Sequence, residues 1–324
     1  MFQNCESLTS IDISSIHNDY VSYNMHNMFQ GCSNLMNINI TSFHSYGYGL
    51  DMLKGLPENG RISTDKKIIG VIEEELPINW VIEAKGKKTV FIAGDSTAKS
   101  SSDEIKGWGE YLSQYVSAEI ENKAFLGQTP RTFYRDGRWN SLIKKIIKGD
   151  YVFIQFGHFE EGDAETNSKC SVDGAGDETI TISLDGVEEI VHTFPWYIKY
   201  FANQVLKKEG IPVLLSPTPE FSFVNGKISK TNKYQEYMKA VSDELKILYI
   251  DHYTYIVNNM ESVGEDKIKD SKWFPIDNVH TSPEAAESNA KMLINGIKCL
   301  NNEDLISILN EEEKNDNYSC LNKE

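Results

Sequence analysis

Four short, continuous runs of apolar residues constrain the fold of this chain most. A continuous run, rather than an alternating one, is typical of a parallel strand buried on both faces of a sheet. The runs cover residues 89–93, 151–156, 212–215 and 247–250. Between them lie helical patterns, such as residues 196–208, which end before the helix-stopping Gly210. Strands alternating with helices predict an α/β domain with a parallel sheet and right-handed crossovers.

The first part of the chain is a sequence repeat. Residues 1–8 (MFQNCESL) recur as residues 28–35 (MFQGCSNL), and IDISSI recurs as INITSF at the same 27-residue offset. The Ile-x-Ile alternation puts two apolar side chains on one face of a short strand. Leucine-rich repeats share this period and the design of one strand per repeat. The residues of the repeat resemble those of the BspA-like leucine-rich repeats of microbial surface proteins. We therefore expect residues 1–56 to be the end of a longer repeat array and residues 57–86 to form a cap and connector.

The composition argues against several functional classes. The chain has 48 Asp and Glu against 32 Lys and Arg, a formal net charge of −16. Nucleic acids and anionic membranes require a basic surface, so neither is an expected partner. No apolar run approaches the roughly 18 residues of a membrane span. The first residues of the chain lack the basic and apolar regions of a signal peptide. A segment of a longer secreted protein would lack them too, so this feature does not decide where the protein is located. We expect a monomer.

A Gly-Asp-Ser sequence directly follows the first apolar run, at the sheet edge where α/β proteins bind ligands. Gly94 permits a sharp turn, and the N–H of Ser96 can face a substrate. Alone, such a tripeptide is more often a solvated turn. The sequence DNVHTS near the other end changes this interpretation, because an imidazole accepts a Ser proton only when a third group fixes its tautomer. Asp277, three residues before His280, can reach that ring. We therefore predict a triad.

Two further segments are expected to complete the site. Gly127 lies in a loop after another short strand and can offer an N–H to an oxyanion. The sequence FGHFE at residues 156–160 follows the third strand. Its His158 is equally compatible with a structural hydrogen-bonding role near the site and with a direct role in the reaction.

These four blocks, in this order, resemble those of the SGNH or GDSL-type hydrolases. Residues 87–300 are similar in particular to the fungal rhamnogalacturonan acetylesterases, and the similarity extends to residues 107–112, 131–138, 185–195, 249–252 and 274–277. The resemblance implies a three-layer, flavodoxin-like parallel sheet with helices on both faces. It also implies removal of acetyl groups from galacturonic acid in pectin.

The resemblance assigns roles to individual residues. Ser96 is expected to be the nucleophile, His280 the general base and Asp277 the residue that orients it, while the N–H groups of Ser96 and Gly127 bind the oxyanion. Further residues expected at the oxyanion or the substrate are Asp95, Arg131, His158 and Phe159. Neither a metal nor an organic cofactor is implied. The expected partner is an acetylated polysaccharide, and the expected location is secreted or cell-surface.

One block departs from the family pattern. The family has Gly-His-Asn-Asp where this chain has Gly157-His158-Phe159-Glu160. That Asn amide is the third oxyanion donor, whose loss typically costs about 10²–10³ in turnover, and an ionised Glu160 would only accept hydrogen bonds. Two hypotheses follow: a slow acetylesterase, or a catalytically impaired relative that acts as a carbohydrate-binding or surface-interaction module. The intact triad favours the enzyme. Phe159→Asn is then expected to raise turnover at least tenfold.

The cysteines and tryptophans give the remaining predictions. The five cysteines form no C-x-x-C pair, which argues against a zinc site or a redox motif. The resemblance implies that Cys299 pairs with Cys320, in an otherwise solvated acidic tail of residues 301–324. The thiols expected to stay free are Cys5, Cys32 and Cys170, the first two buried at the same repeat position. Among the tryptophans, Trp139 is the preferred candidate for a binding cleft.

Overall fold

The computed structural model describes residues 2–16, 25–43, 51–184, 186–229 and 231–321. The chain divides into two compact units. The first comprises residues 1–87, 139–150 and 203–211, and the second comprises residues 88–138, 151–202 and 212–324.

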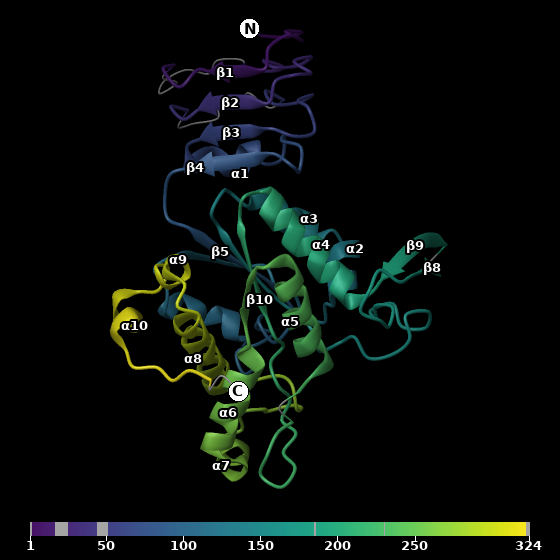
Figure 1. Cartoon of the computed structure of the whole chain (residues 1–324), viewed down its shortest axis with the longest axis vertical. Helices are drawn as coiled ribbons and strands as arrows, with labels where there is room; N and C mark the ends of the chain where they lie inside the picture. The colour runs from purple at the N-terminus through teal and green to yellow at the C-terminus, as the bar shows by residue number, and fades with distance from the viewer. Residues whose placement is uncertain (1, 17–24, 44–50, 185, 230, 322–324) are drawn as a thin grey trace. The chain divides into compact units, whose positions relative to one another are not determined.

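The first unit contains a four-stranded parallel sheet in chain order (Figure 1). Its strands are β1 (Ser10–Asp12), β2 (Asn37–Ile40), β3 (Arg61–Thr64) and β4 (Val81–Ala84). Two short helices, η1 (Lys66–Ile68) and α1 (Ile69–Ile72), lie between β3 and β4 in the chain. Isoleucines stand opposite one another across the whole sheet, from Ile11 to Ile38, Ile62 and Ile82. Each repeat thus supplies a strand, and residues 57–86 add two more strands to the same sheet.

The two N-terminal cysteines differ in burial. Cys32 is fully buried, and its thiol donates to the carbonyl oxygen of Phe2 over 2.9 Å. Cys5 is only half-buried, so the prediction that both thiols lie in the core is wrong for Cys5. Cys5 packs against the apolar core of this unit from its edge.

The second unit is built on a five-stranded sheet with the order β11-β10-β7-β5-β6. The strands are β5 (Thr89–Gly94), β6 (Glu119–Asn122), β7 (Tyr151–Gln155), β10 (Ile211–Leu215) and β11 (Leu248–Ile250). The β5–β6, β5–β7 and β10–β11 pairs are parallel. Every residue of β5 and β7 is buried, as continuous apolar runs require.

Helices cover both faces of this sheet, and Figure 1 shows α5 on one side and α8 on the other. The helices of this unit are η2 (Trp108–Glu110), η3 (Leu112–Gln114), α2 (Pro130–Arg135), the greater part of α4 (Phe194–Lys207), α5 (Lys233–Leu245), α6 (His252–Val263), α7 (Glu265–Asp270), α8 (Pro283–Cys299), α9 (Glu303–Ile306) and α10 (Glu311–Asn315). Nearly all of α3 (Arg138–Lys145) belongs to the first unit. An antiparallel hairpin of β8 (Thr179–Leu184) and β9 (Val187–His192) interrupts this alternation. The predicted three-layer α/β fold is confirmed. No helix among the described residues is long and apolar enough to span a membrane.

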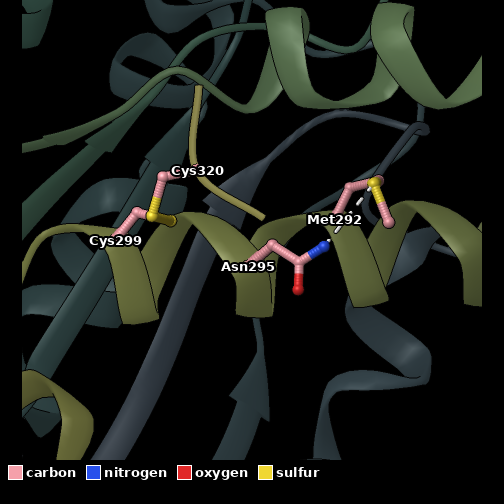
Figure 2. Close-up of a disulfide and its surroundings, with 4 residues drawn as sticks. All are labelled: Met292, Asn295, Cys299 and Cys320. Carbon is pink, nitrogen blue, oxygen red and sulfur yellow. Dashed lines mark hydrogen bonds between the residues drawn. A yellow bond between two sulfur atoms is a disulfide. The ribbon is translucent and has the colours of Figure 1, made fainter. Parts of the chain in front are cut away.

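The C-terminal segment is held against the second unit. Cys299, the last residue of α8, forms a disulfide with Cys320, as the resemblance implied (Figure 2). The remaining cysteines, Cys5, Cys32 and Cys170, are free. The expectation of a solvated tail is wrong for α9 and the turn after it, because Leu305, Ile308 and Leu309 are buried. These apolar side chains lie among acidic residues, so the helical spacing of the apolar residues is hard to recognise in the sequence.

Candidate active site

Ser96 stands in a tight turn at the carboxyl end of β5. A side chain at Gly94 would bring its Cβ within 2.9 Å of the carbonyl oxygen of Gln155, so only glycine fits there. Asp95 is fully buried, and its Oδ1 accepts hydrogen bonds from the N–H and the hydroxyl of Thr97, both over 2.8 Å. Asp95 therefore shapes the turn that presents Ser96, rather than meeting a substrate.

His280 and Asp277 come from the loop between α7 and α8. Nε2 of His280 lies 2.9 Å from Oγ of Ser96, and Nδ1 of His280 lies 2.6 Å from Oδ2 of Asp277. A carboxylate only accepts, so Nδ1 carries the proton and Nε2 is left to accept from the Ser96 hydroxyl. The structure thus brings the three predicted residues into one hydrogen-bonded chain, although 184 residues separate Ser96 from His280.

Local hydrogen bonds fix the orientation of the Asp277 carboxylate. Its other oxygen, Oδ1, accepts from the backbone N–H groups of Val279 and His280, over 2.8 and 2.7 Å. Partial burial opposes the charge, but the hydrogen bonds from His280 and Val279 prevail and hold the pKa of Asp277 below its ordinary value. The carboxylate therefore stays ionised and able to steady a charged imidazole.

Gly127 occupies the loop that follows β6. Its φ of +67° lies in the left-handed region that favours glycine. The N–H of Phe125 donates to the carbonyl oxygen of Gly94 over 3.0 Å, so this loop is tied to the segment that carries Ser96.

The FGHFE block lies after β7. His158 is half-buried, and its Nε2 lies 3.0 Å from Oγ1 of Thr218, a contact that favours the structural interpretation of this residue. Phe159 is also half-buried, and its backbone N–H donates to Oε2 of Glu160 over 2.8 Å.

Glu160 does not behave as an ionised carboxylate. It is buried, and burial together with the nearby charge of Asp95 raises its pKa to about 8. Glu160 is therefore mainly protonated at neutral pH and has an O–H to donate. The expectation that it only accepts hydrogen bonds does not hold for this environment.

Arg131 is placed differently from the prediction. It is fully buried, and its guanidinium forms a two-point ion pair with Glu189 over 3.0 and 2.8 Å. Its Nη1 donates to backbone carbonyls at Ala164, Asn167 and Cys170. Arg131 thus fastens the long loop before β8, and its guanidinium is occupied by partners within the protein. Trp139 is likewise fully buried, so the prediction that it lines a cleft is wrong; its place on α3 turns it into the core.

Two features of this region were not predicted from the sequence. A cavity of about 730 Å³ lies between the loop after β7 and the start of α5, with Glu160, Phe194, Tyr234 and Tyr237 in its wall. Lys169, in the same loop, places its ammonium beside Phe159 and Gly127. No motif could have indicated either, because both depend on how the loop folds back. Among the described residues, no group of three or more His, Cys, Asp or Glu side chains could hold a metal ion.

Comparisons with known proteins show which family the chain is similar to. No protein-family model matches the chain. A rhamnogalacturonan acetylesterase from Emericella nidulans is 34% identical over 214 residues, covering 65% of this chain and 85% of that protein. A probable rhamnogalacturonan acetylesterase from Bacillus subtilis is 26% identical over 221 residues, covering 64% of this chain and 92% of its own length.

A solved structure with the same fold is among the matches. The YxiM protein of Bacillus subtilis superposes with a TM-score of 0.55 at 22% identity, over 70% of this chain and 58% of that one. This likeness shows the fold, and the sequence relatives identify the chain as a carbohydrate esterase of the SGNH/GDSL type that belongs with the rhamnogalacturonan acetylesterases.

Proposed function

We propose that this protein removes acetyl groups from a plant cell-wall polysaccharide of the pectin type, by a Ser-His-Asp acyl-enzyme mechanism. The observation that carries the proposal is the hydrogen-bonded chain from Asp277 through His280 to Ser96. The names of the relatives support the choice of pectin acetyl esters.

Acylation begins when the Ser96 hydroxyl attacks the acetyl carbonyl carbon. Its proton passes to Nε2 of His280, and the carbonyl electron pair moves onto oxygen to form an oxyanion. The N–H groups of Ser96 and Gly127 stabilise that charge. When the tetrahedral intermediate collapses, the carbon–oxygen bond to the sugar breaks, and the sugar oxygen takes the proton from His280.

Deacylation repeats these steps with water. His280 takes one proton from the water as its oxygen attacks the acetyl-Ser96 carbonyl, and that proton then goes to Ser96 Oγ as the bond to the acetyl carbon breaks. The product leaves as acetic acid, which keeps the second water proton until it ionises to acetate in solution. Asp277 steadies the imidazolium in both halves, which its ionised state permits. The cycle needs no further reactant.

The cavity beside Glu160 is a candidate place for a sugar unit of the polysaccharide, although none of the three triad residues lies in its wall. Aromatic side chains of Phe194, Tyr234 and Tyr237 lie in its wall, and aromatic faces pack well against the apolar faces of sugar rings. The same wall carries Glu161, Asp163, Glu165 and Asp173, so it presents carboxyl groups as well as aromatic rings to a ligand.

The arrangement of the whole chain fits a role outside the cell. The Cys299–Cys320 disulfide requires an oxidising compartment, as secreted and cell-surface proteins experience. Within this proposal, residues 1–56 are the last part of a leucine-rich repeat array, residues 57–86 connect it to the esterase domain at 87–300, and residues 301–324 close the chain. The enzyme acts as a monomer on its polysaccharide.

Acetate release tests the function. The chain and its Ser96→Ala variant are incubated with acetylated pectin, with acetylated xylan, and with the same polymers after chemical deacetylation. We expect acetate from acetylated pectin with the parent only. Release from xylan alone would contradict the substrate class, and no release from any ester would favour a binding module instead of an enzyme.

A further inference from the structure

An ammonium group lies beside Phe159, the residue that stands in place of the family's Asn. Nζ of Lys169 is 5.3 Å from the centroid of the Phe159 ring. The same Nζ is 3.2 Å from the point at which a Cβ on Gly127 would stand. One cation therefore lies beside both Gly127, the expected backbone donor, and Phe159, which replaces the expected Asn donor.

The N–H groups of the Lys169 ammonium are available to a ligand. In the described part of the chain, Nζ of Lys169 forms neither a hydrogen bond nor an ion pair, and its contact is with the face of Phe159. An aromatic face holds a cation within about 6 Å without using its N–H groups as a carboxylate would. An ammonium carries three such donors. Lys169 can therefore offer an N–H to a ligand at this point.

The backbone of Lys169 is fastened to the segment that carries Gly127. Its carbonyl oxygen accepts from the hydroxyl of Thr129 over 2.8 Å, and its N–H donates to Oδ1 of Asn167 over 3.0 Å. On either side, the buried Arg131 donates to the carbonyls of Asn167 and Cys170, over 3.3 and 2.6 Å. The loop is thus held in place before any substrate binds, which is what an oxyanion donor requires.

We propose that Lys169 is a catalytic residue that supplies the third oxyanion donor, in the place that the family gives to an Asn amide. The inference rests on the proposed acyl-enzyme function. As Ser96 attacks and the carbonyl electron pair moves onto oxygen, the developing negative charge receives an N–H from Lys169 beside those from Ser96 and Gly127. A hydrogen bond from a charged donor is roughly twice as strong as one from a neutral amide. Phe159 is then a positioning residue for the cation.

Steady-state kinetics on 4-nitrophenyl acetate test this role, because that ester is small and carries no charge that a lysine could bind. We expect Lys169→Met to lower kcat by about 10²–10³ with little change in KM, since the donor acts on the transition state. Lys169→Gln, which keeps an uncharged donor, should recover part of the loss. Lys291→Met, at an exposed position on α8, is the matched control and should behave as the parent does.

A second substitution separates catalysis from folding. Phe159→Asn restores the family amide, so it should raise kcat at least tenfold in the Lys169→Met background. In the parent the gain should be much smaller than the tenfold expected from the sequence, because that expectation assumed that no other group supplies the third donor. Equal kcat values for the parent and Lys169→Met would overturn the proposal. So would a loss confined to KM on pectin, which would make Lys169 a partner of the substrate carboxylate. A parent no more active than Ser96→Ala would overturn the proposed function itself, and this role with it.

Discussion

At the scale of single residues, the site depends on how burial and hydrogen bonds set the protonation of two acids. Asp277 accepts two backbone N–H groups and the imidazole of His280, and it stays ionised. Glu160, buried beside Asp95, is held mainly protonated at neutral pH. The sequence shows two acids next to candidate site residues but cannot show that they differ, because the difference arises from solvent exposure and from neighbours distant in the chain.

Replacing Asp277 by Asn tests the first of these acids. Asn keeps the Oδ1 that accepts from Val279 and His280, but it presents an amide to Nδ1, which favours the wrong imidazole tautomer. We expect kcat for ester hydrolysis to fall about 10⁴-fold with an almost unchanged Tm. Asp270→Asn, at an exposed position of α7, is the control. Retention of more than a tenth of the parent kcat would show that Asp277 does not orient the base.

Glu160 gives a prediction for the pH dependence of stability. Its pKa is about 8 in the folded protein against an ordinary 4.5, so between these values the folded state binds more protons than the unfolded state. The free energy of unfolding should therefore decrease as pH rises from about 4.5 to about 8 and level off above. Glu160→Gln stays neutral and should lack this decrease. Denaturant unfolding at pH 5, 7 and 9 measures it, with the exposed Glu161→Gln as control; parallel curves for parent and Glu160→Gln would contradict the assignment.

At the scale of elements, Arg131 links α2 to the loop that carries Lys169 and to β9. Removing one member of a buried ion pair costs roughly 3–5 kcal/mol, because the other charge remains buried and unpaired. We expect Arg131→Met to destabilise the protein by about that amount. The double variant Arg131→Met/Glu189→Gln should be less destabilised than Arg131→Met alone. Chemical denaturation measures all three; a double variant at least as unstable as Arg131→Met would show that the loop carbonyls, and not Glu189, make Arg131 necessary.

Much of the fold could be predicted at this scale, and the exceptions have physical reasons. The strands β5, β7, β10 and β11 follow from continuous apolar runs, because parallel strands buried on both faces require them. Strands β3 and β4 could not be predicted, since RIST and VIEA carry no copy of the repeat frame and share with it only the isoleucine that stands opposite the isoleucine of the neighbouring strand. Trp139 and Arg131 have side chains typical of a binding surface, but tertiary packing buries both.

At the scale of the whole molecule, one covalent link holds the C-terminal segment. The disulfide joins residues 21 positions apart, and closing such a loop stabilises the folded state by about 3 kcal/mol in the chain-entropy account. We expect Cys320→Ser to lower the free energy of unfolding by about that amount, with kcat unchanged. Titration of the denatured, unreduced parent should find three thiols, at Cys5, Cys32 and Cys170. Five thiols would show that the link does not form.

The proposed mechanism requires Ser96 to be the nucleophile, and covalent labelling of the protein tests this most directly. A 4-nitrophenyl phosphonate ester reacts with an activated serine, releases one nitrophenol and leaves a stable phosphonyl group that mimics the tetrahedral intermediate. We predict one label per chain on the peptide that contains Ser96, much slower labelling of Asp277→Asn, and none of Ser96→Ala. A label on another residue, or equal labelling of Ser96→Ala, would contradict the proposed mechanism.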